Sequence, residues 1–392
     1  MRDGLKVGIS GCGIGGMAAA LFLHRQGHQV SLFDQFKTPT PIGSGLVIQP
    51  VGQAVLDDLG VGQALIKSGG PIFKMSGIES RSRRGVLNVD YGKPGGEVFG
   101  LGIHRGTLFD GLYQAVIGAG INIEHGQVVE ASRLKGEARF LDIAGGQSFG
   151  PFDLLIDASG AGSKLSPIKS RALPYGALWG TVDWPEDSPL PKNRLSQCYR
   201  KAHNMLGVMP MGRMPNETRD KAAIFWSEAV DDLPDWPRDG LQAWKDKAVG
   251  LWPEFKPFVS QITDAAQMTP ATYRHGTLRK PYAQRMAFIG DAAHQASPQL
   301  GQGANMALLD AQVLAKALAS HDDLQTALKA YAAKRRWHVQ LYQTFSAVFT
   351  PFYQSDSAAL PVLRDYVMNP FSYMWPVKPM LTRLVCGTLI KP

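Results

Sequence analysis

The chain has 392 residues, of which 44% are hydrophobic and 19% charged, and this composition excludes a largely disordered protein. Its length exceeds what one ordinary hydrophobic core requires, so we expect two domains with an additional helical part. The 41 basic residues outnumber the 33 acidic ones, and the net charge of +8 favours anionic partners without choosing among them.

The three cysteines, Cys12, Cys198 and Cys386, are odd in number and widely spaced, so they predict neither a disulfide framework nor a metal centre. Glycines interrupt the apolar stretch near the N-terminus, which is unlike a cleavable signal peptide. The sequence has no run of 18 apolar residues, and its basic residues are dispersed rather than gathered as in nucleic-acid modules. We therefore expect a cytoplasmic protein with no spanning membrane segment and no nucleic-acid partner.

A βαβ unit is predicted at the start of the chain. Residues 5–10 form a short β-branched run suited to a buried strand, residues 17–24 contain strong helix formers, and residues 29–33 predict a second strand. This second strand ends on Asp34, whose carboxylate can accept hydrogen bonds from a ribose diol and repels a 2′-phosphate. The pattern therefore favours NAD or FAD over NADP.

The turn between the first strand and the helix reads Gly11-x-Gly13-x-x-Gly16. Gly11 allows the tight turn, Gly13 lets a pyrophosphate approach the helix N-terminus, and Gly16 lets the helix and the strand pack closely. The preceding strand, the following helix and the acidic residue 23 positions after Gly11 make the motif specific. It predicts a dinucleotide-binding site.

The middle of the chain predicts loops, one helix and a group of strands. Hairpin loops are expected at 80–84 and 92–96, a helix from Arg105 to residue 117, and an apolar strand at 152–157. Between residues 174 and 230 the sequence is rich in Trp, Tyr and Val, and strands are expected at 195–199, 205–211 and 222–227.

A second strand–loop–helix segment carries Gly290-Asp291 at the strand end, and Pro298-x-x-Gly301-Gln302-Gly303-x-Asn305 follows before a long helix. A carboxylate at the strand end can hold a polyol hydroxyl, and exposed loop amides suit a ring carbonyl. A cofactor contacted by both glycine-rich segments must be long, which favours FAD.

The last 70 residues predict helices interrupted by prolines. We expect Lys334-Arg335-Arg336 to form a solvated basic helix face. Residues 371–390 mix apolar side chains with prolines, lysine and arginine. Two interpretations of this segment stay open: a helix packed on the FAD domain, or a segment that contacts a membrane or a second subunit.

Taken together, the motifs resemble those of the FAD-dependent aromatic-ring hydroxylases, the class A flavoprotein monooxygenases of the p-hydroxybenzoate and salicylate hydroxylase type. Besides the two glycine-rich segments, the resemblance rests on residues 43–50, which read GSGLVIQP, and on His104-Arg105-x-x-Leu108. It covers about residues 5–350. It implies an α/β fold in which a Rossmann-like FAD-binding domain of glutathione-reductase type interleaves with a mixed β-sheet substrate domain, followed by C-terminal helices.

The domains implied by this resemblance are discontinuous. Residues 1–70, 101–172 and 280–330 would form the FAD-binding domain, residues 71–100 and 173–279 the substrate-binding sheet, and residues 331–392 the C-terminal helical region. The implied partners are FAD, NADH or NADPH as reductant, O₂ and a small aromatic substrate. The protein would act as a monomer or a homodimer.

The resemblance also implies roles for single residues. Asp34 would bind the adenosine ribose, Arg105 the phosphate or ribityl region of FAD, and Asp291 the ribityl chain. The other cofactor-binding candidates are Gly11, Gly13, Ile14, Gly16, Gly45, Val128, Gly301, Gly303, Ala304 and Asn305. A solvated arginine is the alternative interpretation of Arg105, and a packed loop histidine is the simpler interpretation of His294.

The implied chemistry is oxygen transfer: NAD(P)H reduces FAD, O₂ forms a flavin C4a-hydroperoxide, and its distal oxygen passes to an electron-rich ring. The catalytic candidates are Pro298 near the flavin edge and Tyr199 or His203 as a base, with His203 on an exposed turn. The substrate-binding candidates from the sheet are Tyr175, Trp179, Met209, Phe225 and Trp226. A register slip of one residue exchanges the two faces of a strand, so the sequence leaves open which of them point inward.

One segment departs from the family pattern. Where the family has an Asp-Gly segment followed by Ser and Arg, residues 157–166 place Ser159 at the aspartate and Ser166 at the arginine, with Lys164 as a candidate substitute charge. The choice between NADH and NADPH therefore stays open. So does an FAD-dependent oxidoreductase of the same fold that does not hydroxylate, of reductase, epoxidase or halogenase type. A non-catalytic flavin-binding protein at a membrane surface or on a partner is the alternative from another class.

Overall fold

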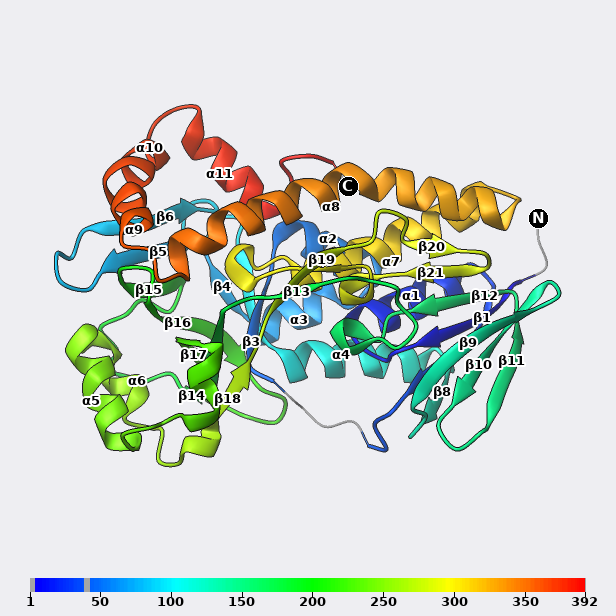
Figure 1. Ribbon diagram of the computed structural model, residues 1–392, viewed down its shortest axis with the longest axis horizontal. Coiled ribbons are helices and arrows are strands. Elements are labelled where there is room, and N and C mark those ends of the chain that lie inside the picture. Colours follow the sequence, from blue (N-terminus) through cyan, green and yellow to red (C-terminus); the bar gives the residue numbers. More distant parts are fainter. Residues whose placement is uncertain (1–3, 39–42, 392) are drawn as a thin grey trace.

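The computed structural model describes residues 4–38 and 43–391 and contains two main β-sheets, one at each end of an elongated molecule (Figure 1). Helix α8 (Leu324–Tyr353) runs along one side of the molecule and reaches both sheets. The predicted α/β fold class with C-terminal helices is confirmed.

The first sheet has six strands, and all but the edge strand β20 run parallel. In spatial order they are β20 (Tyr282–Ala283), β21 (Met286–Phe288), β12 (Leu154–Asp157), β1 (Lys6–Ser10), β2 (Gln29–Asp34) and β8 (Asn122–His125). Strand β1 lies centrally, and its apolar residues are buried on both faces, as is usual for parallel sheets.

Helices pack against one face of this sheet, and a smaller sheet packs against the other. Helices α1 (Ile14–Arg25), α4 (Arg105–Gly118), α7 (Gly303–Ser320) and α8 contribute to the core on one face. A three-stranded sheet, β11 (Ser148–Phe152), β10 (Ala138–Ile143) and β9 (Val129–Lys135), covers the other face. The strand expected at 152–157 is divided between these sheets, because Asp153 exchanges hydrogen bonds with Lys6 where the chain changes sheet.

The second sheet has seven strands, antiparallel except where β15 pairs with β5. In spatial order they are β18 (Met268–Ala271), β14 (Tyr175–Asp183), β17 (Asp220–Ala229), β16 (Asn204–Arg213), β15 (Arg194–Arg200), β5 (Lys74–Glu79) and β6 (Gly85–Asp90). The strands expected within 195–227 are confirmed, and the turn expected at His203 joins β15 to β16.

Residues alternate strictly between the two faces of the second sheet, so the register decides which side chains share a face. Trp179, Tyr199, Met209 and Phe225 lie in one core cluster, toward the first sheet. Trp226 lies in the cluster on the opposite face, under α5 (Leu241–Leu251) and α6 (Lys256–Val259). The prediction that Trp226 shares a lining with Phe225 is therefore wrong, because neighbours along a strand point in opposite directions.

A small sheet joins the two large ones. It consists of β3 (Gly45–Ile48), β7 (Gly100–His104) and β4 (Gly70–Ile72) in spatial order. Helices α2 (Pro50–Asp58) and α3 (Gly62–Ser68) connect β3 to β4 along the chain. At Gly45 a side chain would collide with the sulfur of Met211 and the terminal methyl of Met209. Glycine at this position therefore lets β3 lie directly against the second sheet. A further small sheet contains β13 (Arg171–Ala172), β19 (Arg274–Thr277) and β22 (His294–Gln295).

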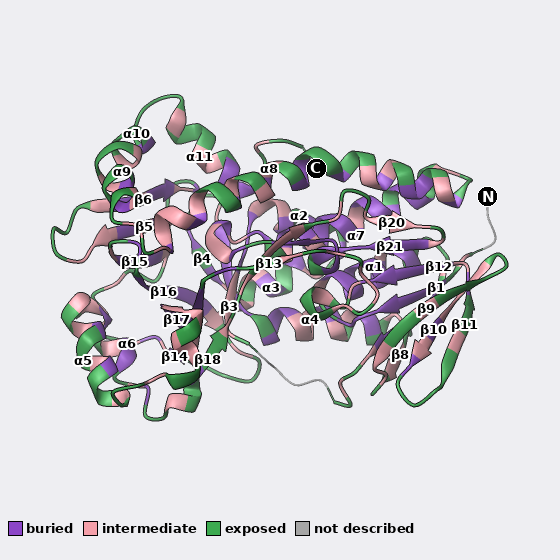
Figure 2. Cartoon of the chain, viewed as in Figure 1, coloured by how far each residue is buried: buried purple, intermediate pink, exposed green. Residues whose placement is uncertain are grey.

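The chain ends in short helices beside β5 and β6 (Figure 1). They are α9 (Ala359–Leu363), the π-helical turn η7 (Arg364–Met368), α10 (Asn369–Ser372) and α11 (Val377–Cys386). Leu384 and Val385 of α11 are buried, whereas much of the outer surface of these helices is exposed (Figure 2). Among the described helices, none has the length and apolar character needed to cross a bilayer.

The domain boundaries given above stay a prediction, and residues 1–3, 39–42 and 392 within them lie outside the described part of the chain. The strands from 74–90 and from 175–271 belong to one sheet, which is the arrangement that the discontinuous boundaries require.

We expect Trp226→Ala to lower the free energy of unfolding by about 3–5 kcal/mol, because removal of a fully buried indole leaves a large cavity. Urea denaturation of the purified protein measures this change. Trp337→Ala is the matched control, since that indole is 60% exposed and its loss should change stability by less than about 0.5 kcal/mol. Equal effects of the two substitutions would contradict the face assignment.

Candidate active site

The first glycine-rich turn has the geometry of an anion-binding site. Gly11 has a φ of 102°, and a Cβ on Gly16 would collide with the carbonyl oxygen of Gly11, so both positions require glycine. Gly13 is exposed, no atom lies within 4 Å of where its Cβ would be, and no side chain caps the helix that begins at Ile14. The amides at the start of α1 are therefore available to a phosphate group.

Asp34 lies beside this turn, at the end of β2. Its carboxylate accepts hydrogen bonds from the backbone N–H of Cys12 (2.6 Å) and of Phe36 (3.2 Å). The carbonyl of Asp34 also accepts from the N–H of Gln127, which brings the half-buried Val128 close to the same strand end. The structure thus brings together the candidates at Asp34, Val128 and the glycine turn.

The second glycine-rich segment repeats the same device at the start of α7. Gly301 has a φ of 58°, Gly303 is exposed with open space at its Cβ position, and no side chain caps this helix. Asn305 holds the segment in place, because its amide nitrogen donates to the carbonyls of Val47 and Gly301 and its oxygen accepts from the N–H of Gln49. Ala304 lies half-buried beside it.

Asp291 lies between the two glycine-rich segments, in the short turn η5 (Gly290–Ala292). Its side chain is accessible to solvent, yet the surrounding protein desolvates the carboxylate and raises its pKa. The charges of His294 and Arg105 act in the opposite direction. Arg105 is exposed at the start of α4, so the structure brings this predicted cation into electrostatic contact with Asp291.

Several buried polar atoms near these segments have no hydrogen-bond partner within the described chain. They are Ser44 Oγ, Gln49 Nε2, Thr107 Oγ1, Gln295 Oε1 and Gln302 Oε1, five of the twelve such atoms. Buried polar groups are normally paired, so their concentration beside the two open helix N-termini indicates a polar ligand. The residues present therefore fit an extended, phosphate-containing cofactor with a polar ring.

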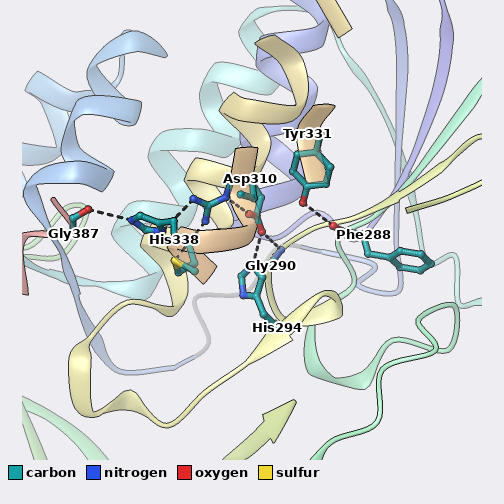
Figure 3. Close-up of polar contacts among 9 residues, drawn as sticks. Phe288, Gly290, His294, Asp310, Tyr331, His338 and Gly387 are labelled. Atoms are coloured by element: carbon teal, nitrogen blue, oxygen red, sulfur yellow. Dashed lines mark hydrogen bonds and ion pairs between the residues drawn. The ribbon is translucent and has the colours of Figure 1, made fainter. Parts of the chain in front are cut away.

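A buried ion cluster fixes the position of η5 (Figure 3). The carboxylate of Asp310, on α7, accepts hydrogen bonds from the N–H of Gly290 (2.9 Å) and from His294 Nε2 (2.6 Å). Its other oxygen accepts from Arg335 Nε (2.7 Å), on α8. Asp310 and Arg335 are at most 1% exposed, so their charges can be neutralised only by each other and by these partners.

The cluster continues to the end of the chain. Arg335 Nη1 lies 3.2 Å from His338 Nδ1, and His338 Nε2 lies 3.2 Å from the carbonyl oxygen of Gly387. Burial, followed by the charge of Arg335, lowers the pKa of His338 to about 4, so this imidazole is neutral near pH 7. Burial alone would raise the pKa of Asp310, but the charges and hydrogen bonds of His294 and Arg335 hold it at about 2.

The expectation of a solvated basic face at 334–336 is therefore wrong for Arg335. Lys334 and Arg336 are exposed, but helical geometry turns the residue between them toward α7. The sequence signal that could have found the cluster is Asp310 itself, a single acid within an apolar helix face. His294 is packed in a loop, in agreement with the simpler interpretation given above.

Pro298 begins the turn η6 (Pro298–Leu300), which α8 holds from one side. The hydroxyl of Ser297 lies 2.6 Å from Thr350 Oγ1, and Gln299 Nε2 donates to Gln354 Oε1 at 2.9 Å. Gln354 in turn donates to the carbonyl of Gly176 on β14 (3.3 Å). These contacts place Pro298 next to the second sheet.

Tyr199 is fully buried on the sheet face that points toward β3. The guanidinium of Arg364 lies 5.0 Å from its ring centroid, and the ring of Tyr353 lies 5.5 Å away. Burial raises the pKa of Tyr199 well above its usual value of 10, so the phenol stays protonated and is not able to accept a proton. This direction argues against the predicted role of Tyr199 as a base.

His203 is exposed at the β15–β16 turn, as expected. Its Nδ1 lies 2.8 Å from the hydroxyl of Tyr175, which also donates to Asp356 (2.5 Å). A hollow of about 310 Å³ opens beside these residues at the end of the sheet. None of the predicted cofactor-binding residues lines this hollow, so it is separate from the two glycine-rich turns.

The segment that departs from the family pattern folds back on itself. The Asp157 carboxylate is buried and accepts hydrogen bonds from Ser159 and Ser163, which counteract the rise in its pKa that burial causes. Ser166 donates to the carbonyl of Ala292 and so ties the segment to η5. Lys164 pairs with Glu130 at the surface (3.5 Å). Among the described residues, no group of His, Cys, Asp and Glu side chains could hold a metal ion.

The chain is similar to known flavoproteins over most of its length. Residues 4–104 and 201–346 match the model of a family described as "FAD binding domain". The aurachin C monooxygenase/isomerase of Stigmatella aurantiaca is 28% identical over 342 residues, covering 86% of each chain. A kynurenine 3-monooxygenase of Xanthomonas campestris is 27% identical, covering 84% of this chain and 75% of the relative.

Solved structures show the same fold. A tetrameric 2-methyl-3-hydroxypyridine-5-carboxylic acid oxygenase superposes with a TM-score of 0.79 at 19% identity, covering 97% of both chains. A single-residue variant of HpxO from Klebsiella pneumoniae, complexed with FAD, superposes with a TM-score of 0.81 at 18% identity and covers 98% of both chains.

We expect Asp310→Asn to destabilise the protein by about 3–5 kcal/mol at pH 7, because Arg335 is left buried without a counter-charge. The folded pKa of Asp310, about 2, lies below its usual 3.8, so the carboxylate contributes stability above about pH 4 and loses it as the pH falls toward 2. The difference between the two proteins should therefore shrink below pH 4.

Urea denaturation at pH 7, 4 and 3 measures this difference. Asp246→Asn on the exposed surface of α5 is the matched control and should change stability by less than about 0.5 kcal/mol at each pH. A difference that does not depend on pH would show that the charge of Asp310 is not what stabilises the cluster.

Proposed function

The chain belongs to the family of FAD-dependent aromatic-ring hydroxylases, and on this premise we propose that it is a monooxygenase that uses NAD(P)H and O₂ to hydroxylate a small aromatic or conjugated cyclic compound. The observation that carries the proposal is the pair of uncapped, glycine-lined N-termini of α1 and α7, two helices that pack together, with Asp291 in the turn η5 that contacts α7.

The residues that would hold FAD are those of the two glycine-rich turns, together with Asp34, Arg105 and Asp291. We propose that Asp34 accepts hydrogen bonds from the adenosine ribose and that the amides following Gly13 bind the pyrophosphate. Asp291 would bind the ribityl hydroxyls with Arg105 beside it, and the amides from Gly301 to Asn305 would bind the pyrimidine end of the ring. When bound, FAD supplies the redox and oxygen-transfer chemistry.

The chain itself would position the substrate ring and exclude water from it. Trp179, Met209 and Phe225 line the sheet face toward Gly45, and Pro298 would close the space from the side of α8. These substrate contacts are uncharged, and the thioether of Met209 adapts to irregular shapes, so we propose a neutral, largely apolar ring as the substrate. The relatives named above include one monooxygenase named for aurachin C and one named for kynurenine.

Proton transfer would use the exposed end of the sheet. Because Tyr199 stays protonated, it would act as a hydrogen-bond donor or as part of the lining rather than as a base. His203 shares a hydrogen bond with the hydroxyl of the buried Tyr175 and is itself exposed. We propose that this pair passes a proton between the interior of the sheet and solvent.

A second candidate function is an FAD-dependent oxidoreductase of the same fold that does not hydroxylate. The segment 157–166 favours it, since Asp157 is used internally by Ser159 and Ser163, and Lys164 pairs with Glu130. Docking of a nicotinamide dinucleotide through this segment would thus differ from the family pattern.

Oxygenated product distinguishes these two functions. With a panel of neutral phenols, hydroxyquinolines and hydroxypyridines, we expect an active substrate to accelerate NADH or NADPH oxidation and to yield product carrying one oxygen atom from ¹⁸O₂. Stopped-flow absorbance and mass spectrometry measure the two quantities. Substrate-stimulated oxidation without ¹⁸O in the product would favour the non-hydroxylating alternative.

We expect Asp291→Ala to weaken FAD binding by about 1.5–3 kcal/mol, because it removes a charge-assisted hydrogen bond to the ribityl chain. The dissociation constant, measured by flavin fluorescence, reports the change. Asp246→Ala, at an exposed position of α5, is the control and should bind FAD like the unmodified protein. Unchanged affinity of the Asp291 variant would contradict its assignment.

A further inference from the structure

Exposed apolar side chains gather on the C-terminal helices. Trp375 is 84% exposed, and the short helices α9 to α11 carry most of the exposed large hydrophobic residues that the structure describes. We call these residues the C-terminal patch: Val362, Leu363, Tyr366, Val367, Phe371, Tyr373, Met374, Trp375 and Met380. An apolar surface of this kind marks an interaction site rather than ordinary surface composition.

The patch lies on a firmly packed base. Leu384 and Val385 of α11 are buried in two different core clusters, and the carbonyl of Leu384 accepts a hydrogen bond from the hydroxyl of Tyr342 (2.7 Å). Thr382 donates to the carbonyl of Asp90 on β6 (2.8 Å). The outer surface is therefore presented by helices whose inner side already has its partners.

Exposed basic side chains occur in the same segment and in the hairpin packed against it. The hairpin between β5 and β6 lies against these helices, and the guanidinium of Arg84 stands 4.8 Å from the ring centroid of Tyr366. The exposed cations of the hairpin and of the C-terminal segment are Arg81, Arg83, Arg84, Lys378, Arg383 and Lys391. Two of them have acidic partners: Arg83 pairs with Glu254, and Lys378 pairs with Asp90 (3.0 Å).

Negative charge is scarce at this surface. Between residues 359 and 391 the sequence contains a single acid, Asp365, and its carboxylate accepts from Arg364 Nε at 2.6 Å. Arg364 is itself buried, so this pair adds no net charge to the surface. The patch is therefore aromatic and aliphatic, and most of the exposed charges of the segment that carries it are positive.

We propose that the C-terminal patch docks the protein onto an anionic phospholipid surface. Exposed Trp, Tyr and Phe side chains suit the boundary between headgroups and acyl chains, and the surrounding Arg and Lys side chains match anionic headgroups. A second copy of the chain fits less well, because a twofold contact through the patch would bring the same cations together. The helices lie on the membrane and do not cross it, in keeping with their short length.

Co-sedimentation of the full-length, FAD-loaded protein with vesicles tests the proposal. We expect binding to vesicles of phosphatidylcholine with 30% phosphatidylglycerol, several-fold weaker binding to phosphatidylcholine alone, and release as NaCl is raised from 0.1 to 1 M. The protein should stay monodisperse without vesicles at the same concentration in analytical ultracentrifugation.

Two variants separate the apolar and the electrostatic contributions. Phe371→Ala/Trp375→Ala should lower the vesicle partition coefficient about tenfold or more, because two exposed rings no longer enter the interface. Arg81→Glu/Arg383→Glu should lower the vesicle partition coefficient by at least about tenfold, and only on anionic vesicles, because it replaces attraction to the headgroups by repulsion. Trp337→Ala removes another exposed indole from α8, outside the patch, and should bind like the unmodified protein.

All variants alter exposed side chains, and retained flavin absorbance and circular dichroism verify their folding. Failure of the unmodified protein to bind anionic vesicles would overturn the proposal. So would a loss of binding in the Trp337 control equal to that of the patch variants. A dimer that disappears in Phe371→Ala/Trp375→Ala, without vesicle binding, would overturn it as well and identify the patch as an interface between copies of the chain.

Discussion

The buried carboxylate of Asp310 is the constraint on which the candidate site depends. An isolated charge in a protein interior costs several kcal/mol unless opposite charges and hydrogen-bond donors surround it. Asp310 obtains these from Gly290 and His294 in one loop and from Arg335 on α8. Because a single carboxylate needs all three contacts, the loop that carries Asp291, the helix that begins at Gly303 and the C-terminal helix α8 must take fixed relative positions.

Close backbone contacts at glycine are the second constraint. Gly16 lets α1 approach the turn at Gly11, and Gly45 lets β3 approach Met209 and Met211 on the second sheet. The first contact shapes the glycine-rich turn before α1, and the second brings β3 directly against the apolar face of the second sheet. Both depend on the absence of a single carbon atom, so any other residue at either position would have to displace backbone or core side chains.

The local parts of this arrangement could be predicted from the sequence, because short-range patterns encode them. The strand before Gly11, the helix after it and the acid at Asp34 follow from hydrophobic period and motif spacing, and the structure contains all three. Asp310 within an apolar helix face signals a buried partner, but short-range patterns do not identify Arg335 as that partner, because it lies 25 residues further along the chain. The sequence also does not determine which face of β17 points inward, because Phe225 and Trp226 are both large and apolar. The pairing of β17 with β14 and β16 determines which of the two side chains lies on each face.

The C-terminal segment divides its apolar side chains between two environments. Val385 and Cys386 belong to the core cluster that contains Met209 and Phe225, whereas Phe371 and Trp375 are exposed. The same short helices therefore carry both the buried contacts that fix their position and the exposed patch. Because the buried side chains already have partners in the core, the packing of the chain does not require Phe371 and Trp375 to be apolar. Their exposure is what distinguishes this patch from an ordinary packed helix pair.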